Sequence, residues 1–148
     1  MFLLDTNHCS LLLNGDTKVV AQLQAHSDSP VSTSVISQGE LTYMSQASQR
    51  QIVNAQRISS FLSGIRIYPV SSEAARIYGQ LKADIFDHFG PKEKARRRHT
   101  AIQHLGFSDN DLWIAAIALE HEATIVSCDS DFTRMREVVK LQLVDWTT

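Results

Sequence analysis

Short apolar runs alternate along this chain with longer segments in which apolar residues recur at helical spacing. The short runs predict buried strands, and they fall at residues 2–4, 31–35, 65–68, 124–127 and 138–144. The longer segments predict helices, and they fall at residues 8–14, 17–26, 37–47, 49–62, 72–86 and 108–121. Because strands and helices alternate from start to finish, the pattern predicts an α/β fold: a three-layer α/β/α sandwich around a mostly parallel sheet.

Length and composition agree with one globular domain. The chain has 148 residues, of which 43% are hydrophobic and 20% are charged, so residues 1–148 are expected to form a single domain. The longest apolar run, Leu112 to Leu119, is far shorter than the roughly twenty residues of a membrane span. The first residues lack the regions of a signal peptide, and two cysteines are too few for a disulfide framework. We therefore expect a soluble cytoplasmic protein without a membrane segment.

Four acidic residues fall where the predicted elements meet. Asp5 directly follows the first predicted strand, and Asp129 lies just after the fourth. Glu40 and Asp111 lie near the starts of two predicted helices. In a parallel sheet, the carboxyl ends of the strands and the N-termini of the following helices share one edge. The four carboxylates are therefore expected to converge on one cleft.

Carboxylates brought together in this way predict a particular chemistry. Four of them cannot share a small site while ionised unless cations compensate their charge. Oxygen ligands suit a hard ion such as Mg²⁺ or Mn²⁺. Such an ion lowers the pKa of a bound water and neutralises phosphoryl oxygens, which are the two requirements of phosphodiester hydrolysis.

Each of the four carboxylates also has a structural explanation. Asp5 is a favoured N-cap residue type, and Asp111 has the spacing of a capping box with Ser108. Asp129 is a common turn residue type, and Glu40 suits a solvated helix face. The residues alone leave metal binding and structural roles open.

Five segments spread over the chain carry a family resemblance. They are Leu3–Asn7, Gly39–Leu41, Asp109–Ala116, Ser127–Phe132 and Val144–Trp146. In their order and spacing they resemble PIN-domain proteins, and specifically the VapC-type toxins of type II toxin–antitoxin systems. The resemblance covers essentially the whole chain and implies a PIN-like α/β/α sandwich. It also implies a metal-dependent endoribonuclease that hydrolyses RNA phosphodiester bonds and is neutralised by a cognate antitoxin protein.

The resemblance assigns roles to individual positions. The implied catalytic residues are Asp5, Glu40, Asp111 and Asp129. The implied ligands of Mg²⁺ or Mn²⁺ are Asp5, Asp111 and Asp129, and the implied supporting residues are Thr6, Asn7 and Ser127. Ser127 stands where the family commonly has Thr. Asp109 and Asp131 compete for neighbouring roles.

A basic segment interrupts a chain whose formal net charge is −2. Residues 92–98 contain five Lys or Arg residues and a single Glu. They lie in a stretch, about residues 88–105, that is longer than the family's usual connection, and we interpret it as a basic insertion. Lys and Arg contacts to phosphate give sequence-independent affinity, so Arg96, Arg97 and Arg98 are expected to bind the RNA backbone. A solvated tether or helix face is the alternative.

Two other functions stay open at this point. One is a phosphatase with Asp5 as nucleophile, although such enzymes usually have a second Asp where this chain has Asn7. The other is a non-catalytic PIN module that binds RNA or a partner, and the four intact acidic positions argue against it. We also expect a homodimer. The apolar positions of the early helices are candidates for the homodimer and antitoxin interfaces.

Overall fold

The computed structural model describes residues 1–148 and contains one central sheet. Its five strands lie in the order β3-β2-β1-β4-β5, and every neighbouring pair is parallel. The strands are β1 (Phe2–Leu4), β2 (Val31–Ser34), β3 (Arg66–Tyr68), β4 (Thr124–Val126) and β5 (Leu143–Val144). The predicted α/β fold with a parallel sheet is confirmed.

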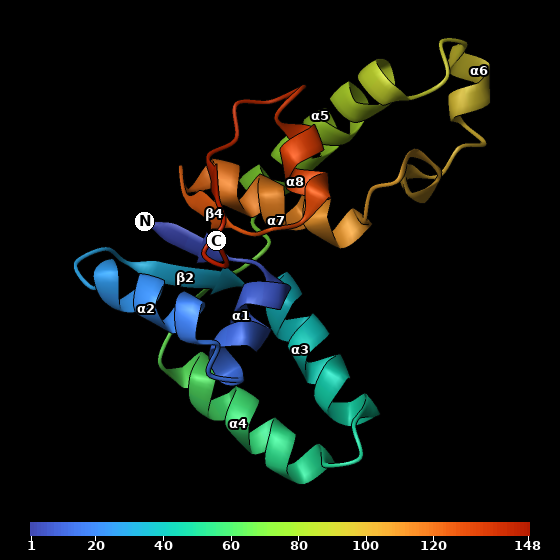
Figure 1. Cartoon of the computed structure of the whole chain (residues 1–148). Helices are drawn as coiled ribbons and strands as arrows, with labels where there is room; N and C mark the ends of the chain where they lie inside the picture. Colours follow the sequence, from blue (N-terminus) through green and yellow to red (C-terminus); the bar gives the residue numbers. More distant parts are fainter.

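The chain also forms eight α-helices and one 3₁₀-helix. They are α1 (Thr6–Leu13), α2 (Thr17–Ala25), α3 (Val35–Ala47), α4 (Gln51–Ser63), α5 (Ser72–Phe89), α6 (Lys94–Arg97), η1 (Ile102–Leu105), α7 (Asp109–Glu120) and α8 (Ser130–Met135). In Figure 1, α5, α7 and α8 lie on one side of the sheet, and α1, α2 and α4 lie on the other. This arrangement gives the three layers of the predicted sandwich.

Alternate residues of the central strands contribute to two separate cores. Leu3 and Ile125 are buried with residues of α5, α7 and α8, whereas the next residues, Leu4 and Val126, are buried with residues of α1, α2 and α3. The alternation follows from strand geometry, because successive side chains point to opposite faces of a sheet. Helix α7 packs so deeply that Ile114–Ala118 are all buried. Its burial accounts for the long apolar run in the sequence.

The end of the chain differs most from the sequence prediction. The predicted strand 138–144 is only two residues long, Leu143–Val144. Val138 and Val139 instead form turns after α8, and both of their N–H groups donate to the Met135 carbonyl at 3.0 Å. They pack against the core from this turn. Their apolar character therefore reflects burial rather than strand structure.

Several helix boundaries also differ from the prediction, one helix is missed, and capping explains part of these differences. Helix α3 begins two residues early, because the Ser34 hydroxyl accepts a hydrogen bond from the Ser37 N–H at 3.1 Å. The sequence pattern predicts no helix at α8, which Asp129 caps at its N-terminus. Helix α5 runs three residues further than predicted and ends at Gly90.

Helix α5 extends beyond the sheet and carries residues 88–105, here called the basic arm, at its far end (Figure 1). The arm contains α6 and η1. Arg134 of α8 anchors its base: the guanidinium lies 4.0 Å from the Phe107 ring centroid and donates to the carbonyls of Leu105 and Gly106. None of the helices combines the length and apolar character that crossing a membrane requires.

Candidate active site

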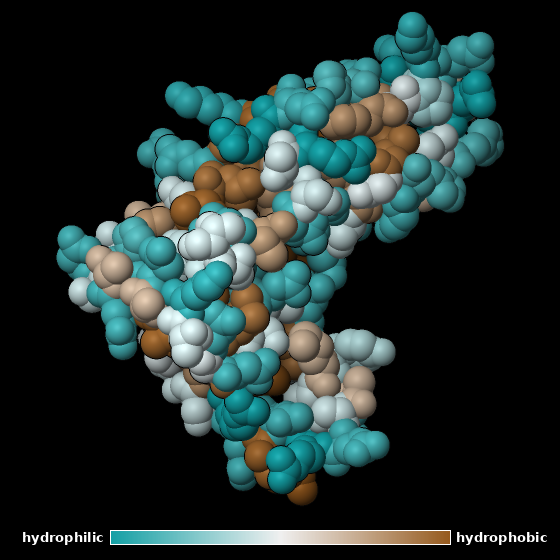
Figure 2. Space-filling model, viewed as in Figure 1, coloured by the Kyte–Doolittle hydropathy of each residue, from teal (hydrophilic) through white to brown (hydrophobic).

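A pocket of about 700 Å³ lies at the carboxyl edge of the sheet. It is formed by the starts of α1 and α7, by α3 and by the loop before α8. All four predicted catalytic residues line it: Asp5, Glu40, Asp111 and Asp129. Thr6 and Asn7 line it as well. Figure 2 shows that the molecular surface is hollowed between the basic arm and the α3–α4 lobe.

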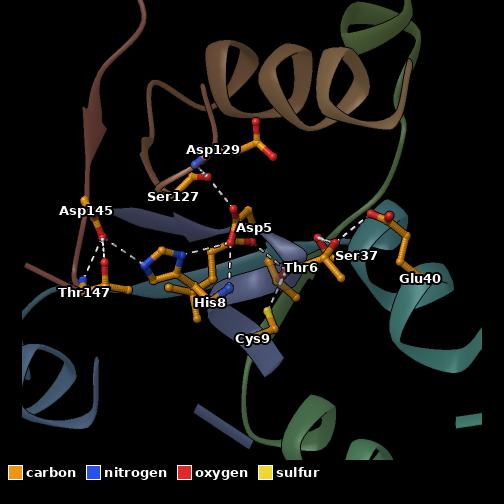
Figure 3. A network of polar contacts seen from close by, with 12 residues as sticks. Asp5, Thr6, His8, Cys9, Ser37, Glu40, Ser127, Asp129, Asp145 and Thr147 are labelled. Carbon is orange, nitrogen blue, oxygen red and sulfur yellow. Dashed lines mark hydrogen bonds and ion pairs between the residues drawn. The ribbon is translucent and has the colours of Figure 1, made fainter. Parts of the chain in front are cut away.

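Asp5 is held from two sides at the end of β1 (Figure 3). One carboxylate oxygen, Oδ1, accepts the His8 N–H at 2.7 Å and so caps α1. The other oxygen accepts the hydroxyl of Ser127, which follows β4. Only 3% of Asp5 is exposed. The capping role considered for Asp5 is therefore real, and it fixes the same carboxylate at the pocket wall.

Asp111, Asp129 and Asp131 form the densest group of carboxylates. One oxygen from each lies within 4.8 Å of the others. Asp129 caps α8 by accepting the Asp131 N–H at 2.8 Å, and Asp131 accepts the Ser108 N–H at 2.7 Å. An oxygen-only set at this spacing suits a hard divalent cation. Asp131 is thus a fourth candidate ligand beside Asp5, Asp111 and Asp129.

The electrostatics of Asp111 fit that interpretation. Burial raises the pKa of Asp111 from its ordinary value of 3.8 to about 8, and the charges of Asp129, Asp131 and Glu40 act in the same direction. A bound cation would relieve this repulsion. The capping box considered for Asp111 is absent, since the Ser108 side chain makes no capping hydrogen bond.

Glu40 approaches the pocket from α3. It is the sixth residue of that helix, so it lies in the second turn, near the helix start as expected from the sequence. The Thr6 hydroxyl donates to Glu40 Oε1 at 2.7 Å and lies 3.1 Å from the Ser37 hydroxyl (Figure 3). Thr6 therefore links the start of α1 to the catalytic candidate on α3. Asn7 is exposed at the pocket wall.

Two residues behind Asp5 were not identified from the sequence. The His8 ring is fully buried and has its Nδ1 3.1 Å from Asp5 Oδ1 and its Nε2 3.7 Å from Asp145 Oδ1. Asp145 accepts the N–H and the hydroxyl of Thr147 at 2.7 and 2.6 Å. Burial acts to raise the pKa of Asp145, but the Thr147 hydrogen bonds and the nearby His8 hold it below the ordinary value. The three-residue spacing of Asp5 and His8, which is that of an N-cap and N3, is the signal that points to their contact.

The predicted RNA-binding arginines do not line the pocket. They lie in the basic arm, in or directly after α6. Arg97 pairs with the Asp87 carboxylate and donates from Nε to the Pro91 carbonyl at 2.7 Å. Arg96 and Arg98 are exposed and form no ion pair. Of the three, Arg96 and Arg98 are therefore free to contact another molecule.

Known proteins resemble this chain in sequence and in fold. Ribonuclease VapC5 of Mycobacterium tuberculosis is 25% identical over 116 residues, which are 77% of this chain and 75% of that protein. The structure of VapBC2 from Rickettsia felis, bound to a DNA fragment from their promoter, has a TM-score of 0.77 at 24% identity, with 98% of each chain covered. FitAcB from Neisseria gonorrhoeae has a TM-score of 0.73 at 23% identity, with 99% of each chain covered.

The family assignment rests on a model of the whole domain. The model described as "PIN domain" matches residues 2–138, a range that includes all four pocket carboxylates. The fold and the order of the sequence segments agree with it. This chain therefore belongs to the PIN-domain family.

Proposed function

We propose that this protein is a metal-dependent endoribonuclease and the toxin of a toxin–antitoxin pair. The observation that carries the proposal is the convergence of Asp5, Glu40, Asp111 and Asp129 on one pocket of a PIN-domain chain. The similarity to ribonuclease VapC5 supports RNA as the substrate. An aspartyl phosphatase is a poorer fit, because this chain has Asn7 where such enzymes usually have a second Asp.

The pocket residues divide into metal ligands and supporting groups. Asp111 and Asp129 would hold Mg²⁺ or Mn²⁺ together with Asp5, which lines the same pocket, and Asp131 is a further candidate close to Asp111 and Asp129. When bound, the ion supplies a water of lowered pKa and neutralises phosphoryl charge. Ser127 keeps Asp5 at the pocket wall through its hydroxyl.

Glu40 has a separate role in this proposal. Thr6 holds its Oε1, while Oε2 accepts no hydrogen bond from the chain. Glu40 Oε2 is therefore available to take a proton from the attacking water. Asn7, exposed beside it, is available to donate to substrate oxygens.

The basic arm would bind the substrate outside the pocket. Arg96 and Arg98 are exposed and free of ion pairs, so they are available to contact RNA phosphates. Arg97 would instead hold the arm together through Asp87 and Pro91. In this view residues 1–148 form one domain, and residues 88–105 are an insertion in it.

An antitoxin would inhibit the protein by covering the acidic pocket. Several similar structures are described as VapBC complexes or as a toxin–antitoxin complex, which supports a protein partner of this kind. Exposed apolar side chains on α3 and α4 are available for that partner or for a second copy of the chain. They are Tyr43, Met44, Ile52 and Val53.

RNA cleavage with and without a chelator tests the proposed function. The purified protein is expected to cleave RNA in Mg²⁺ or Mn²⁺, to stop in excess EDTA and to recover when the ion is restored. A non-catalytic PIN module would bind RNA without cleaving it in any of these conditions. A phosphatase would release phosphate from a monoester and form a covalent adduct on Asp5. Either result would refute the proposal.

A further inference from the structure

A chain of three polar residues runs away from the pocket behind Asp5, and only its Asp5–His8 contact is a hydrogen bond. Asp5 lies at its front, the His8 ring follows, and Asp145 lies at its far end (Figure 3). These residues come from the end of β1, from α1 and from the segment after β5. The chain therefore joins the pocket wall to the last residues of the protein.

The surroundings of His8 make it more than a space-filling residue. Its ring is 0% exposed, and burying a polar group is costly unless a hydrogen bond compensates it. Nδ1 contacts Asp5 Oδ1 at 3.1 Å. Nε2 makes no hydrogen bond and faces Asp145 Oδ1 at 3.7 Å. Both ring nitrogens thus face carboxylates, and a hydrophobic residue would fill the same space without either contact.

The far carboxylate is itself fixed. Thr147 donates its N–H and its hydroxyl to the same Asp145 oxygen that faces the His8 ring. The imidazole ring therefore lies between the carboxylate of Asp5 and a fixed oxygen of Asp145. His8 is therefore placed to limit the movement of the Asp5 carboxylate.

We propose that His8 is a positioning residue for the metal site: its ring nitrogen Nδ1 holds Asp5 Oδ1 while the Ser127 hydroxyl holds Oδ2. The proposal rests on the proposed function, in which Asp5 is a metal ligand. Hydrogen-bonded partners of metal-binding carboxylates orient the ligand, and their loss typically weakens metal binding about 10- to 100-fold. His8 would contribute in this way without touching metal or RNA.

Two polar substitutions test the contact of Nδ1 and the contact of Nε2 separately. The amide nitrogen of His8→Asn takes the position of Nδ1 and can still donate to Asp5, but it cannot reach Asp145. The amide of His8→Gln extends to the position of Nε2 and loses the Nδ1 contact. His8→Leu removes both contacts. His26→Leu is the matched control, since His26 has a backbone partner, the Gln22 carbonyl at 2.8 Å, in place of a carboxylate.

Mn²⁺ affinity, measured by calorimetry on the EDTA-treated full chain, is the main readout. We expect His8→Gln and His8→Leu to bind Mn²⁺ about 10- to 100-fold more weakly, and His8→Asn to keep most of the affinity. Excess Mn²⁺ should restore RNA cleavage to the weakened variants. The His26→Leu control should lower the melting temperature in EDTA and leave Mn²⁺ affinity unchanged.

The possible outcomes separate this inference from the proposed function. Equal Mn²⁺ affinity in the parent and all three His8 variants would overturn the positioning role, while cleavage by the parent would leave the proposed function intact. If His8→Asn and His8→Gln weakened Mn²⁺ affinity equally, the positioning role would also be overturned. The Nδ1 contact, which only His8→Asn keeps, would then make no difference to metal binding. A parent that binds no Mn²⁺ would overturn both. If His8→Leu fails to fold, the difference in Mn²⁺ affinity between His8→Asn and His8→Gln still tests the positioning role.

Discussion

The acidic pocket and the basic arm differ in how firmly the fold holds their charged side chains. In the pocket, Asp5 and Asp129 cap helices as well as line the cavity, so the fold itself fixes their carboxylates. In the arm, Arg96 lies in a four-residue helix and Arg98 directly after it, and neither has an ion-pair partner. Long exposed side chains lose entropy when they are ordered. The carboxylates of the pocket are therefore preorganised, whereas the exposed arginines of the arm are adaptable and available to attract phosphate.

The largest expected effect comes from removing one carboxylate of the pocket. Asp111→Asn keeps the side-chain shape but removes a charge from the proposed metal site, and we expect RNA cleavage to fall at least about 100-fold. The variant should fold, because Asp111 caps nothing. Cleavage rate and Mn²⁺ binding are the measurements.

The adjacent acidic residue provides a matched control. Asp109 faces away from the pocket and accepts the Tyr78 hydroxyl at 2.5 Å. Asp109→Asn should therefore cleave RNA at nearly the parental rate. Loss of cleavage in both variants, or in neither, would contradict the assignment of Asp111 to the site.

The second prediction concerns stability and pH in the absence of metal. The folded protein holds the Asp111 proton up to about pH 8, whereas the unfolded chain releases it near 3.8. Between these values the folded state binds more protons, so this group's contribution to stability falls as the pH rises and is lost near pH 8. Melting temperatures in EDTA should show Asp111→Asn gaining stability over the parent at pH 8 but not at pH 4. A constant difference between the two proteins across this range would refute the prediction.

The third prediction concerns the arm. Replacing Arg96 and Arg98 together by Ala should weaken RNA binding and reduce the steepness of its salt dependence by about 1.4, as expected for two lost phosphate contacts on a single strand. Binding titrations at several salt concentrations measure both quantities. Arg97→Ala is the comparison, since its contacts to Asp87 and Pro91 are internal. An unchanged salt slope in the double variant would indicate that the arm serves as a tether or binds another partner.

The smallest expected effect comes from Arg134 of α8, which anchors the base of the basic arm. Arg134→Gln removes the guanidinium from the Phe89 and Phe107 rings, which lie 4.8 and 4.0 Å away. Such contacts contribute about 1 kcal/mol. Hydrogen exchange should quicken in residues 88–105 and stay unchanged in β1 and β4. Faster exchange throughout the sheet would instead make Arg134 part of the core.

The sequence predicted the acidic residues at the carboxyl edge of the sheet more accurately than the residues behind Asp5. Asp5 and Asp129 were expected at this edge because both follow predicted strands, and the structure places both in the pocket. The contact from His8 to Asp145 joins residues far apart in sequence, and it depends on where the segment after β5 lies. The residues before that segment, 138–144, were predicted as one strand, since buried turn residues such as Val138 and Val139 share the apolar pattern of a strand.

The arm illustrates a different limit of sequence reasoning. Three consecutive arginines look equivalent in the sequence, yet Arg97 alone turns back to Asp87 and Pro91. Helical direction decides which of the three faces the chain and which face outward. The sequence left open whether this stretch is a loop or a helix, and it predicted no orientation for the short helix α6. The structure therefore narrows the RNA-binding prediction to Arg96 and Arg98.

A crystal structure with Mn²⁺, in which the ion is located by its anomalous scattering, tests the central claim most directly. The account predicts a peak in the acidic pocket, coordinated by carboxylate oxygens of Asp111 and Asp129 and next to Asp5. The peak should be lost in Asp111→Asn and kept in Asp109→Asn. A pocket without Mn²⁺ at a concentration that supports RNA cleavage, or an ion bound elsewhere on the chain, would contradict the account.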